Sequence, residues 1–202
     1  LVSQLGPTAA VTKIRKYTLD LYKELEKKVD HSAGLRLNGA LSIAQHKGRW
    51  QELQRQATTA QLYDVDVRIL NKDQIKKDYP IINTDEVIGG ILMPGDGAAD
   101  PSGVTHMLAK AARMEGAQIF EKSPVDEILT KDGKISGVKV KGQKIECDYI
   151  VLASGMWSRQ IGEKAGVSIP LYPAEHFYII TEPIENLSKT LPVVRDFDNR
   201  TY

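Results

Sequence analysis

The stretch CDYIVLASGMWSRQIG, residues 147–162, indicates the fold class most clearly. Its apolar run at residues 149–153 is typical of a strand that is buried on both faces of a parallel sheet. Ser154 and Gly155 then turn the chain into a helix expected near residues 157–165. Small residues at the end of such a strand let a ligand approach the backbone, and the free N–H groups at the start of the helix suit a phosphate. An ordinary strand–turn–helix connection has the same pattern, so both interpretations stay open.

The loop PGDGAADPSG, residues 94–103, precedes this stretch and leads into a helix. Asp100 is a favourable N-cap and Pro101 suits the first helical position. The helix is expected over residues 101–114, and Gly116 is typical of the position just past its end. The aspartates of the loop therefore favour a capping and turn role over a metal loop, because the spacing of an EF-hand is absent.

Periodicity and turn residues predict the other elements. A helix over residues 12–29 carries one apolar stripe, made by Ile14, Tyr17, Leu21 and Leu25. The pair Asp132-Gly133 is a strong hairpin signal. The strands or extended segments expected are residues 35–44 with a tight turn at Asn38-Gly39, 65–70, 87–93, 117–121, 125–130, 135–140 and 171–181. Two more helices are expected, at residues 47–63 and in a short segment that Asn71 caps.

The order of these elements predicts a mixed α/β fold. A parallel sheet with an antiparallel flap is expected from residues 94–167, because a helix, a hairpin and a buried strand follow one another there. Antiparallel signals dominate residues 35–93 and 168–202, which are expected to form a second layer or domain.

Composition excludes several classes of protein. The chain has 202 residues with 27 Lys+Arg against 26 Asp+Glu, so it lacks the basic excess of a nucleic-acid-binding domain. No apolar run approaches the roughly 20 residues that span a bilayer. The single cysteine, Cys147, excludes an intramolecular disulfide framework and a cysteine zinc cluster. The histidines form no i, i+4 pair, so no metal site is predicted; they are His31, His46, His106 and His176.

Three longer motifs, in this order and spacing, resemble one family. They are GDGAADPSGVTHMLAKAARMEGAQIFEKSPVDEI (95–128), YIVLASGMWSRQIGEKAGVSIPLYPAEHFYIITEP (149–183) and LPVVRDFDNRTY (191–202). Together they resemble the flavin-dependent amine oxidoreductases of the D-amino-acid oxidase type, in the sarcosine and dimethylglycine dehydrogenase branch. The resemblance implies an enzyme of one-carbon metabolism that oxidises an N-methylated glycine by hydride transfer to FAD. The alternatives are an oxidase of glycine, a D-amino acid or another secondary amine, an NAD-dependent enzyme, which has no such resemblance, and a cofactor-free binding module.

The resemblance also assigns domains and site residues. Residues 1–34 and 94–167 would belong to a Rossmann-like FAD domain, and residues 35–93 and 168–202 to a mostly antiparallel substrate domain. The implied FAD contacts are Val125, Ala153, Ser154, Gly155 and Trp157. The implied catalytic residues are His176 and Tyr202, which would orient the amine at the flavin and bias its protonation. Arg195 either holds a substrate carboxylate or forms a structural ion pair.

Parts of the family pattern are expected outside the chain. The phosphate-binding Gly-x-Gly-x-x-Gly unit would precede Leu1, as would a histidine that can bond covalently to FAD, because LVSQL resembles the tail of that segment. A tetrahydrofolate-binding region would follow Tyr202. We therefore interpret the chain as an internal fragment that does not bind FAD with normal affinity by itself. The expected partner is a small amine, with no nucleic acid, no membrane span and an unspecified electron acceptor. The expected location is the cytoplasm, or the mitochondrial matrix of a eukaryote.

Overall fold

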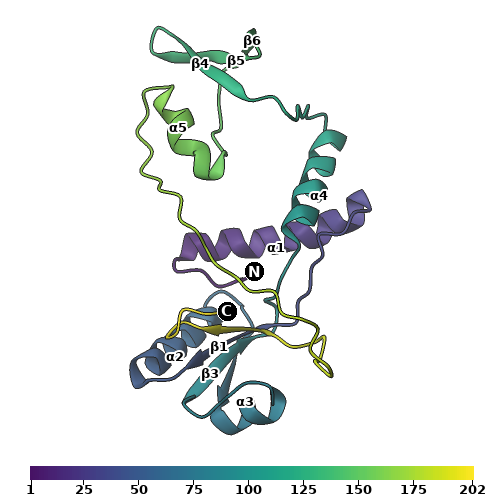
Figure 1. Ribbon diagram of the computed structural model, residues 1–202, viewed down its shortest axis with the longest axis vertical. Helices are drawn as coiled ribbons and strands as arrows, with labels where there is room; N and C mark the ends of the chain where they lie inside the picture. The colour runs from purple at the N-terminus through teal and green to yellow at the C-terminus, as the bar shows by residue number, and fades with distance from the viewer. The chain divides into compact units, whose positions relative to one another are not determined.

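The computed structural model describes all 202 residues, and they form two compact units (Figure 1). Unit 1 contains residues 1–117 and 186–202, and unit 2 contains residues 118–185. Helices and strands occur in both units, so the predicted mixed α/β class is confirmed. The units follow other boundaries than the FAD and substrate domains expected from the sequence, and that functional division stays a prediction.

A four-stranded sheet forms the centre of unit 1. Its strands are β1 (Ala40–Ala44), β2 (Arg68–Asn71), β3 (Gly89–Met93) and β7 (Val193–Asp196), in the order β2-β3-β1-β7. β3 pairs antiparallel with both β1 and β2, whereas β7 lies parallel to β1 with Ala40 opposite Val193. Every residue of β1 and β3 is buried, because both faces of the sheet are covered.

Two helices cover opposite faces of this sheet, α2 (Lys47–Gln61) and α3 (Lys72–Asp78) (Figure 1). Successive side chains of a strand point to opposite faces, so Leu41 and Ile43 of β1 pack with Ile75 of α3, whereas Ala44 packs with Leu53 of α2. The predicted cap of α3 is confirmed: Asn71 Oδ1 accepts a hydrogen bond from the Gln74 N–H at 2.9 Å, and the Gln74 side chain accepts one from the Asn71 N–H.

A second helical layer of unit 1 contains α1 (Ala9–Val29) and α4 (Pro101–Met114), which meet around Val29 and Met107. The predicted N-cap of α4 is confirmed, because the Asp100 carboxylate accepts hydrogen bonds from the N–H groups of Ser102 and Gly103. Just past its end, Gly116 has a φ of +92°, which suits glycine at that position.

The predicted apolar stripe of α1 is partly wrong. Ile14 and Tyr17 are exposed, and the residues that α1 buries are Thr12, Leu19 and Val29. Thr12 can be buried because its hydroxyl accepts from the Gly6 N–H and donates to the Thr8 carbonyl, so no polar group is left unpaired.

Unit 2 contains a three-stranded antiparallel sheet, β4-β5-β6 (Val125–Lys131, Lys134–Val140 and Gln143–Glu146). The predicted hairpin is confirmed: Asp132 and Gly133 have φ of 52° and 74°, as the two-residue turn between twisted strands requires. A third strand, β6, was not predicted; it follows a similar turn at Lys141-Gly142. The helix expected at residues 157–165 is present but shorter, as α5 (Ser158–Glu163). A single 3₁₀ turn, η1 (Gly155–Trp157), leads into it.

Three predicted extended segments form no strand, namely residues 117–121, 149–153 and 171–181. The run expected to be buried is instead open to solvent, with Tyr149 88% and Val151 89% exposed. A strand needs a neighbour for its N–H and C=O groups, and no strand of this chain pairs with these segments. Parallel pairing therefore occurs only between β1 and β7. Residues 35–38 also form no hairpin with β1: Gly39 has the expected positive φ, but Arg36 bridges to Ala98.

Candidate functional site

Two adjoining clefts of about 570 Å³ each in unit 1 share three lining residues, Arg15, Arg195 and Phe197. We call the first the α2 cleft; its other lining residues are Leu5, Gly6, Pro7, Arg49, Glu52, Arg55, Gln56 and Thr59. We call the second the Tyr202 cleft; its other lining residues are Leu1, Ser3, Asp196, Arg200, Thr201 and Tyr202. Four arginines line the α2 cleft and three line the Tyr202 cleft, against one carboxylate in each, so the clefts favour an anionic ligand.

Arg195 stands where the two clefts meet. It lies in β7 opposite Ser42 of β1, and its side chain is only 16% exposed. Its Nη2 atom is 3.9 Å from Oδ2 of Asp96, which is too far for a hydrogen bond. Arg195 donates no hydrogen bond to any other side chain or carbonyl of the chain. Its planar set of N–H donors is therefore available to a ligand in the clefts.

Asp96 is the buried counter-ion of this arginine. The chain turns after β3, with the Asp96 N–H bonded to the Met93 carbonyl, and this turn places the carboxylate inside unit 1. The side chain is fully buried; Oδ1 accepts a hydrogen bond from the Gln4 N–H at 2.9 Å, and Oδ2 has no hydrogen-bond partner. Asp96 thus has a role beyond the turn that the sequence analysis favoured.

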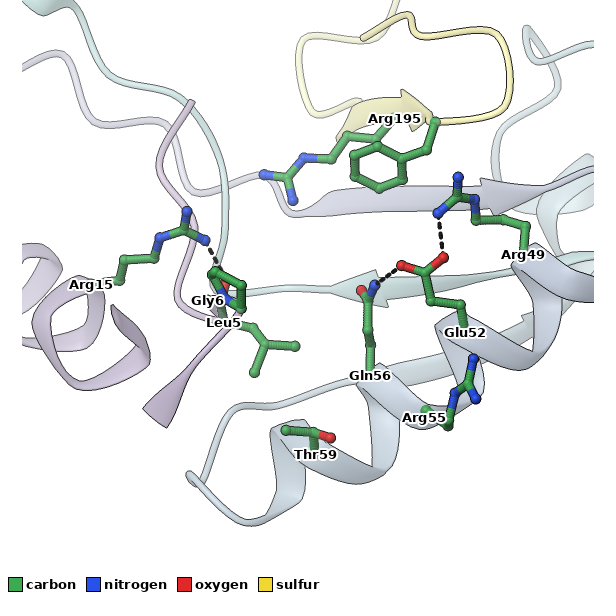
Figure 2. Close-up of a pocket in the computed structure, with 11 residues that line it drawn as sticks. Leu5, Gly6, Arg15, Arg49, Glu52, Arg55, Gln56, Thr59 and Arg195 are labelled. Carbon is green, nitrogen blue, oxygen red and sulfur yellow. Dashed lines mark hydrogen bonds and ion pairs between the residues drawn. The ribbon is translucent and has the colours of Figure 1, made fainter. Parts of the chain in front are cut away.

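Burial and neighbouring charges act against each other in this cluster. Burial raises the pKa of Asp96 above its ordinary value, although the backbone and side chain of Gln4 and the charges of Arg195 and Arg15 act in the opposite direction. The pKa of Arg195 is lowered by burial and by the charge of Arg15, and Asp96 acts in the opposite direction. Figure 2 shows the guanidinium groups of Arg15 and Arg195 directed toward each other from α1 and β7. Two cations thus face one carboxylate, which leaves excess positive charge for an anion to neutralise.

The outer wall of the α2 cleft is held by a second set of ion pairs. Arg49 Nε donates to Asp198 Oδ1 at 2.9 Å, and its guanidinium lies 5.4 Å from the centre of the Phe197 ring. Arg49 also pairs with Glu52, which in turn accepts a hydrogen bond from Gln56 (Figure 2). These contacts fix the turn that follows β7 against the N-terminal end of α2.

The structure brings two of the predicted site residues together, since Arg195 and Tyr202 line the same cleft. Two backbone hydrogen bonds join Asp196 to Thr201 and close the turn that separates Arg195 from Tyr202. They therefore fix the position of the backbone just before Tyr202. Arg15 was not predicted, because nothing in its helical position distinguishes it from a solvated charge. Only the folded chain, in which Arg15 and Arg195 line the same two clefts, reveals it.

The remaining predicted site residues lie in unit 2. Val125 begins β4, and its carbonyl accepts a hydrogen bond from Lys164 Nζ at the end of α5, 3.3 Å away. The hydroxyls of Ser154 and Ser158 are hydrogen-bonded at 3.0 Å. Trp157 is exposed, and His176 lies in the exposed segment without strands.

The small residues of unit 2 suit a cofactor that contacts backbone. Ala153 is exposed, and Gly155 has a φ of +55° with nothing within 4 Å of the place where a Cβ would stand. A bulky group can therefore reach the main chain there. This open backbone fits the predicted FAD contact, which itself stays a prediction.

Comparison with known proteins identifies the family of the chain. The sequence model of the family described as "DAO: FAD dependent oxidoreductase" matches residues 2–202. The chain belongs to this family of FAD-dependent oxidoreductases. Two curated relatives are 4-methylaminobutanoate oxidase (formaldehyde-forming) of Paenarthrobacter nicotinovorans, 35% identical over 202 residues, and mitochondrial sarcosine dehydrogenase of Homo sapiens, 33% identical over 208 residues. Each match covers all of this chain, but only 24% and 22% of the respective relative, so the chain spans about a quarter of their length.

The fold agrees with a solved member of the same group. The crystal structure of L-proline dehydrogenase from P. horikoshii superposes with a TM-score of 0.88 and 25% sequence identity, covering 98% of this chain and 53% of that one. No helix of the structure combines the length and the hydrophobicity needed to cross a membrane. No group of three or more His, Cys, Asp or Glu side chains is arranged to hold a metal ion.

Proposed function

We propose that the protein oxidises an N-methylated amine that carries a carboxylate, with an N-methylated glycine such as sarcosine or dimethylglycine as substrate. The observation that carries this proposal is the partly buried guanidinium of Arg195, which donates no hydrogen bond. A second cation, Arg15, lies near it, and one buried carboxylate, that of Asp96, is close to both. A substrate carboxylate would neutralise the excess charge and accept the unused N–H donors. The printed names of the relatives agree, because both sarcosine and 4-methylaminobutanoate are N-methyl amino acids.

The other end of the substrate would lie toward Tyr202, which lines the same cleft as Arg195. A phenol beside the amine can orient it by hydrogen bonding and favour the neutral form from which hydride leaves. We assign the same orienting role to His176. The FAD contacts are assigned to Val125, Ala153, Ser154, Gly155 and Trp157. FAD, when bound, supplies the acceptor for the hydride.

Three further assignments belong to this proposal. FAD is bonded covalently through a histidine upstream of Leu1, and the whole protein uses tetrahydrofolate. Its location is the mitochondrial matrix if the source is a eukaryote, and otherwise the cytoplasm; sarcosine dehydrogenase of Homo sapiens is named as mitochondrial. Acid precipitation tests the first assignment: covalent flavin stays with the pelleted protein, whereas free FAD remains in the supernatant.

A substrate panel tests the proposed function. The full-length protein carrying FAD is mixed without oxygen with sarcosine, dimethylglycine, 4-methylaminobutanoate, glycine and dimethylamine, and bleaching of the flavin is followed. We expect at least one N-methyl amino acid to reduce the flavin more than 100-fold faster than dimethylamine, which has no carboxylate. Equal rates with and without a carboxylate would contradict the proposal, and preference for glycine would favour a primary-amine oxidase.

Variants of Arg195 test the residue that carries the proposal. Arg195→Met removes the charge but retains much of the side-chain volume, so KM for the carboxylate substrate should rise by roughly 10- to 100-fold, which corresponds to losing one charge-assisted contact. Arg113→Met, on α4 and outside both clefts, is the matched control and should leave KM unchanged. An unchanged KM in Arg195→Met would show that Arg195 only forms a structural ion pair and does not bind the substrate.

A further inference from the structure

The buried carboxylate of Asp96 uses only one of its two oxygens. Oδ1 accepts the hydrogen bond of the Gln4 N–H, which ties the N-terminal segment to the turn after β3. Oδ2 is buried without any hydrogen-bond partner. Buried polar atoms are normally paired, so an unpaired carboxylate oxygen inside a small unit calls for a reason. The structural tie to Gln4 explains the first oxygen and leaves the second unexplained.

The second oxygen faces a cation at a distance that attracts without bonding. Arg195 Nη2 is 3.9 Å from Oδ2, whereas a direct charge-assisted N–H···O bond is about 2.7–2.9 Å long. At the longer distance the two charges still stabilise each other, especially where little water screens them. The pair therefore holds the guanidinium in place without using its N–H donors.

The charge of Arg15 is the reason why Arg195 needs a counter-ion to stay in place. Its guanidinium is close enough to lower the pKa of Arg195, and like charges repel most strongly in a partly buried setting. Without a counter-ion, the long and flexible Arg195 side chain would turn away from Arg15 and toward solvent. Asp96 is the one carboxylate that is fully buried beside both arginines.

We propose that Asp96 is a positioning residue, which holds Arg195 at the junction of the two clefts by charge alone and leaves its N–H donors free for a ligand carboxylate. This inference rests on the proposed function for the identity of the ligand. The charge of Asp96 has two consequences of opposite sign for an anion. Direct repulsion between the Asp96 carboxylate and the ligand carboxylate weakens binding, whereas the positioning of Arg195 strengthens it. In this proposal the positioning of Arg195 has the larger effect on the affinity for the ligand.

Asp96→Asn separates these effects, because asparagine retains Oδ1 as the acceptor for Gln4 but loses the charge. The full-length protein and its variants are titrated with acetate, a carboxylate without an amine, by calorimetry, and KM and kcat are measured with the substrate. We expect the Kd for acetate and KM to rise about 10-fold in Asp96→Asn, with kcat within about twofold. Asp100→Asn, four residues along the same loop, keeps a good N-cap and should change neither constant.

A double-mutant cycle shows whether Asp96 acts through Arg195. In the Arg195→Met background, Asp96→Asn should have no further effect on the Kd for acetate. Tighter or unchanged acetate binding in Asp96→Asn overturns the proposal, as does a loss that persists without Arg195. Acetate binding that depends on both residues, in a protein that oxidises no N-methyl amino acid, would reject the proposed function and leave this inference standing.

If Asp96→Asn does not fold, the effect of the Asp96 charge can be measured without substituting Asp96, by changing the pH. Methanesulfonate is an anion whose own charge does not change above pH 3, and the groups facing Asp96 are two arginines that stay ionised. Protonation of Asp96 at low pH should therefore weaken methanesulfonate binding severalfold. Glu52 and Asp196 also line the clefts, so the titration is made in Glu52→Gln/Asp196→Asn, which removes both of these carboxylates. Constant or tighter binding in that variant as the pH falls overturns the proposal.

Discussion

Single side chains join parts of unit 1 that are far apart in the sequence. Asp198 is the clearest case, since its carboxylate accepts hydrogen bonds from the Gln45 N–H at 3.1 Å and from Arg49 Nε at 2.9 Å, and lies 3.0 Å from His46 Nε2. Asp196 adds a hydrogen bond from the Gln45 side chain at 2.9 Å. One turn after β7 is thereby fastened to the start of α2, about 150 residues earlier in the chain.

Removing the charge of Asp198 should destabilise unit 1 in a pH-dependent way. Burial alone would raise its pKa, but the hydrogen bonds from Arg49 and Gln45 and the nearby positive charges outweigh burial and lower the pKa below its ordinary 3.8. The stabilisation is therefore present above pH 3.8 and is lost as the pH falls through the lower folded-state pKa. We expect Asp198→Asn to lower the free energy of unfolding by about 1–2 kcal/mol at pH 7.

Urea denaturation at several pH values measures this difference. It should shrink as the pH falls below 3.8. Asp85→Asn makes the same chemical change in an exposed loop and should have no effect at any pH. A difference that grows as the pH falls below 3.8 would show that the sign of the Asp198 pKa shift is wrong.

Only part of the residue-level site was accessible from the sequence. Arg195 and Tyr202 were predicted from a motif, and Asp100 and Asn71 from local capping chemistry, because a cap depends on residues three positions away. Arg15 and the ion pairing of Asp96 were not predictable, because they depend on contacts between segments about 100 to 180 residues apart.

Among the predicted secondary-structure elements of unit 2, the hairpin that depends on local turn residues formed, whereas strands that need a distant partner did not. The hairpin at Asp132-Gly133 needs no distant partner, and it is present where predicted. The strands expected at 117–121 and 149–153 need a neighbouring strand, and they are absent. Apolar sequence identifies a segment that can become a strand, but the hydrogen-bonded neighbour determines whether it does.

Two glycine substitutions of opposite effect test this local control. Gly133 has a φ of +74° and open space around it, so Gly133→Ala should lower the free energy of unfolding of unit 2 by about 1 kcal/mol through backbone strain alone. Gly48 lies in the first turn of α2 without a positive φ, and its added methyl would make only ordinary contacts with His46. Gly48→Ala should therefore stabilise unit 1 by about 0.5–1 kcal/mol.

Thermal and urea unfolding of the two variants, followed by circular dichroism, checks both signs. If alanine is tolerated at position 133 as well as at 48, the positive φ of Gly133 would not be required for the turn.

For the whole molecule, the distribution of exposed apolar side chains is unusual. Unit 1 has a buried core on both faces of its sheet, whereas residues 177–180 of unit 2 are four large hydrophobic side chains in succession, each more than 80% exposed. Such a run has high β-propensity and no charge, and is typical of segments that associate between molecules.

Breaking this run should improve the behaviour of the 202-residue chain. Ile179 is 90% exposed, so Ile179→Lys should leave the unfolding temperature unchanged while raising the concentration at which light scattering begins by severalfold. Thr181→Lys adds the same charge next to the run without removing a hydrophobic side chain, and should have a smaller effect. Equal solubility of Ile179→Lys and the wild type would show that other surfaces drive association.

The parallel pairing of β7 with β1 has a consequence for the order in which the chain is made. Residues 186–202 complete a sheet whose other three strands end at Met93, and all of unit 2 lies between them in the sequence. A ribosome therefore releases β1, β2 and β3 well before the strand that covers the free edge of β1. During that interval the edge is unpaired, and a chaperone or a neighbouring nascent chain has access to it. Slow translation of residues 118–185 would lengthen this exposure without changing the final fold.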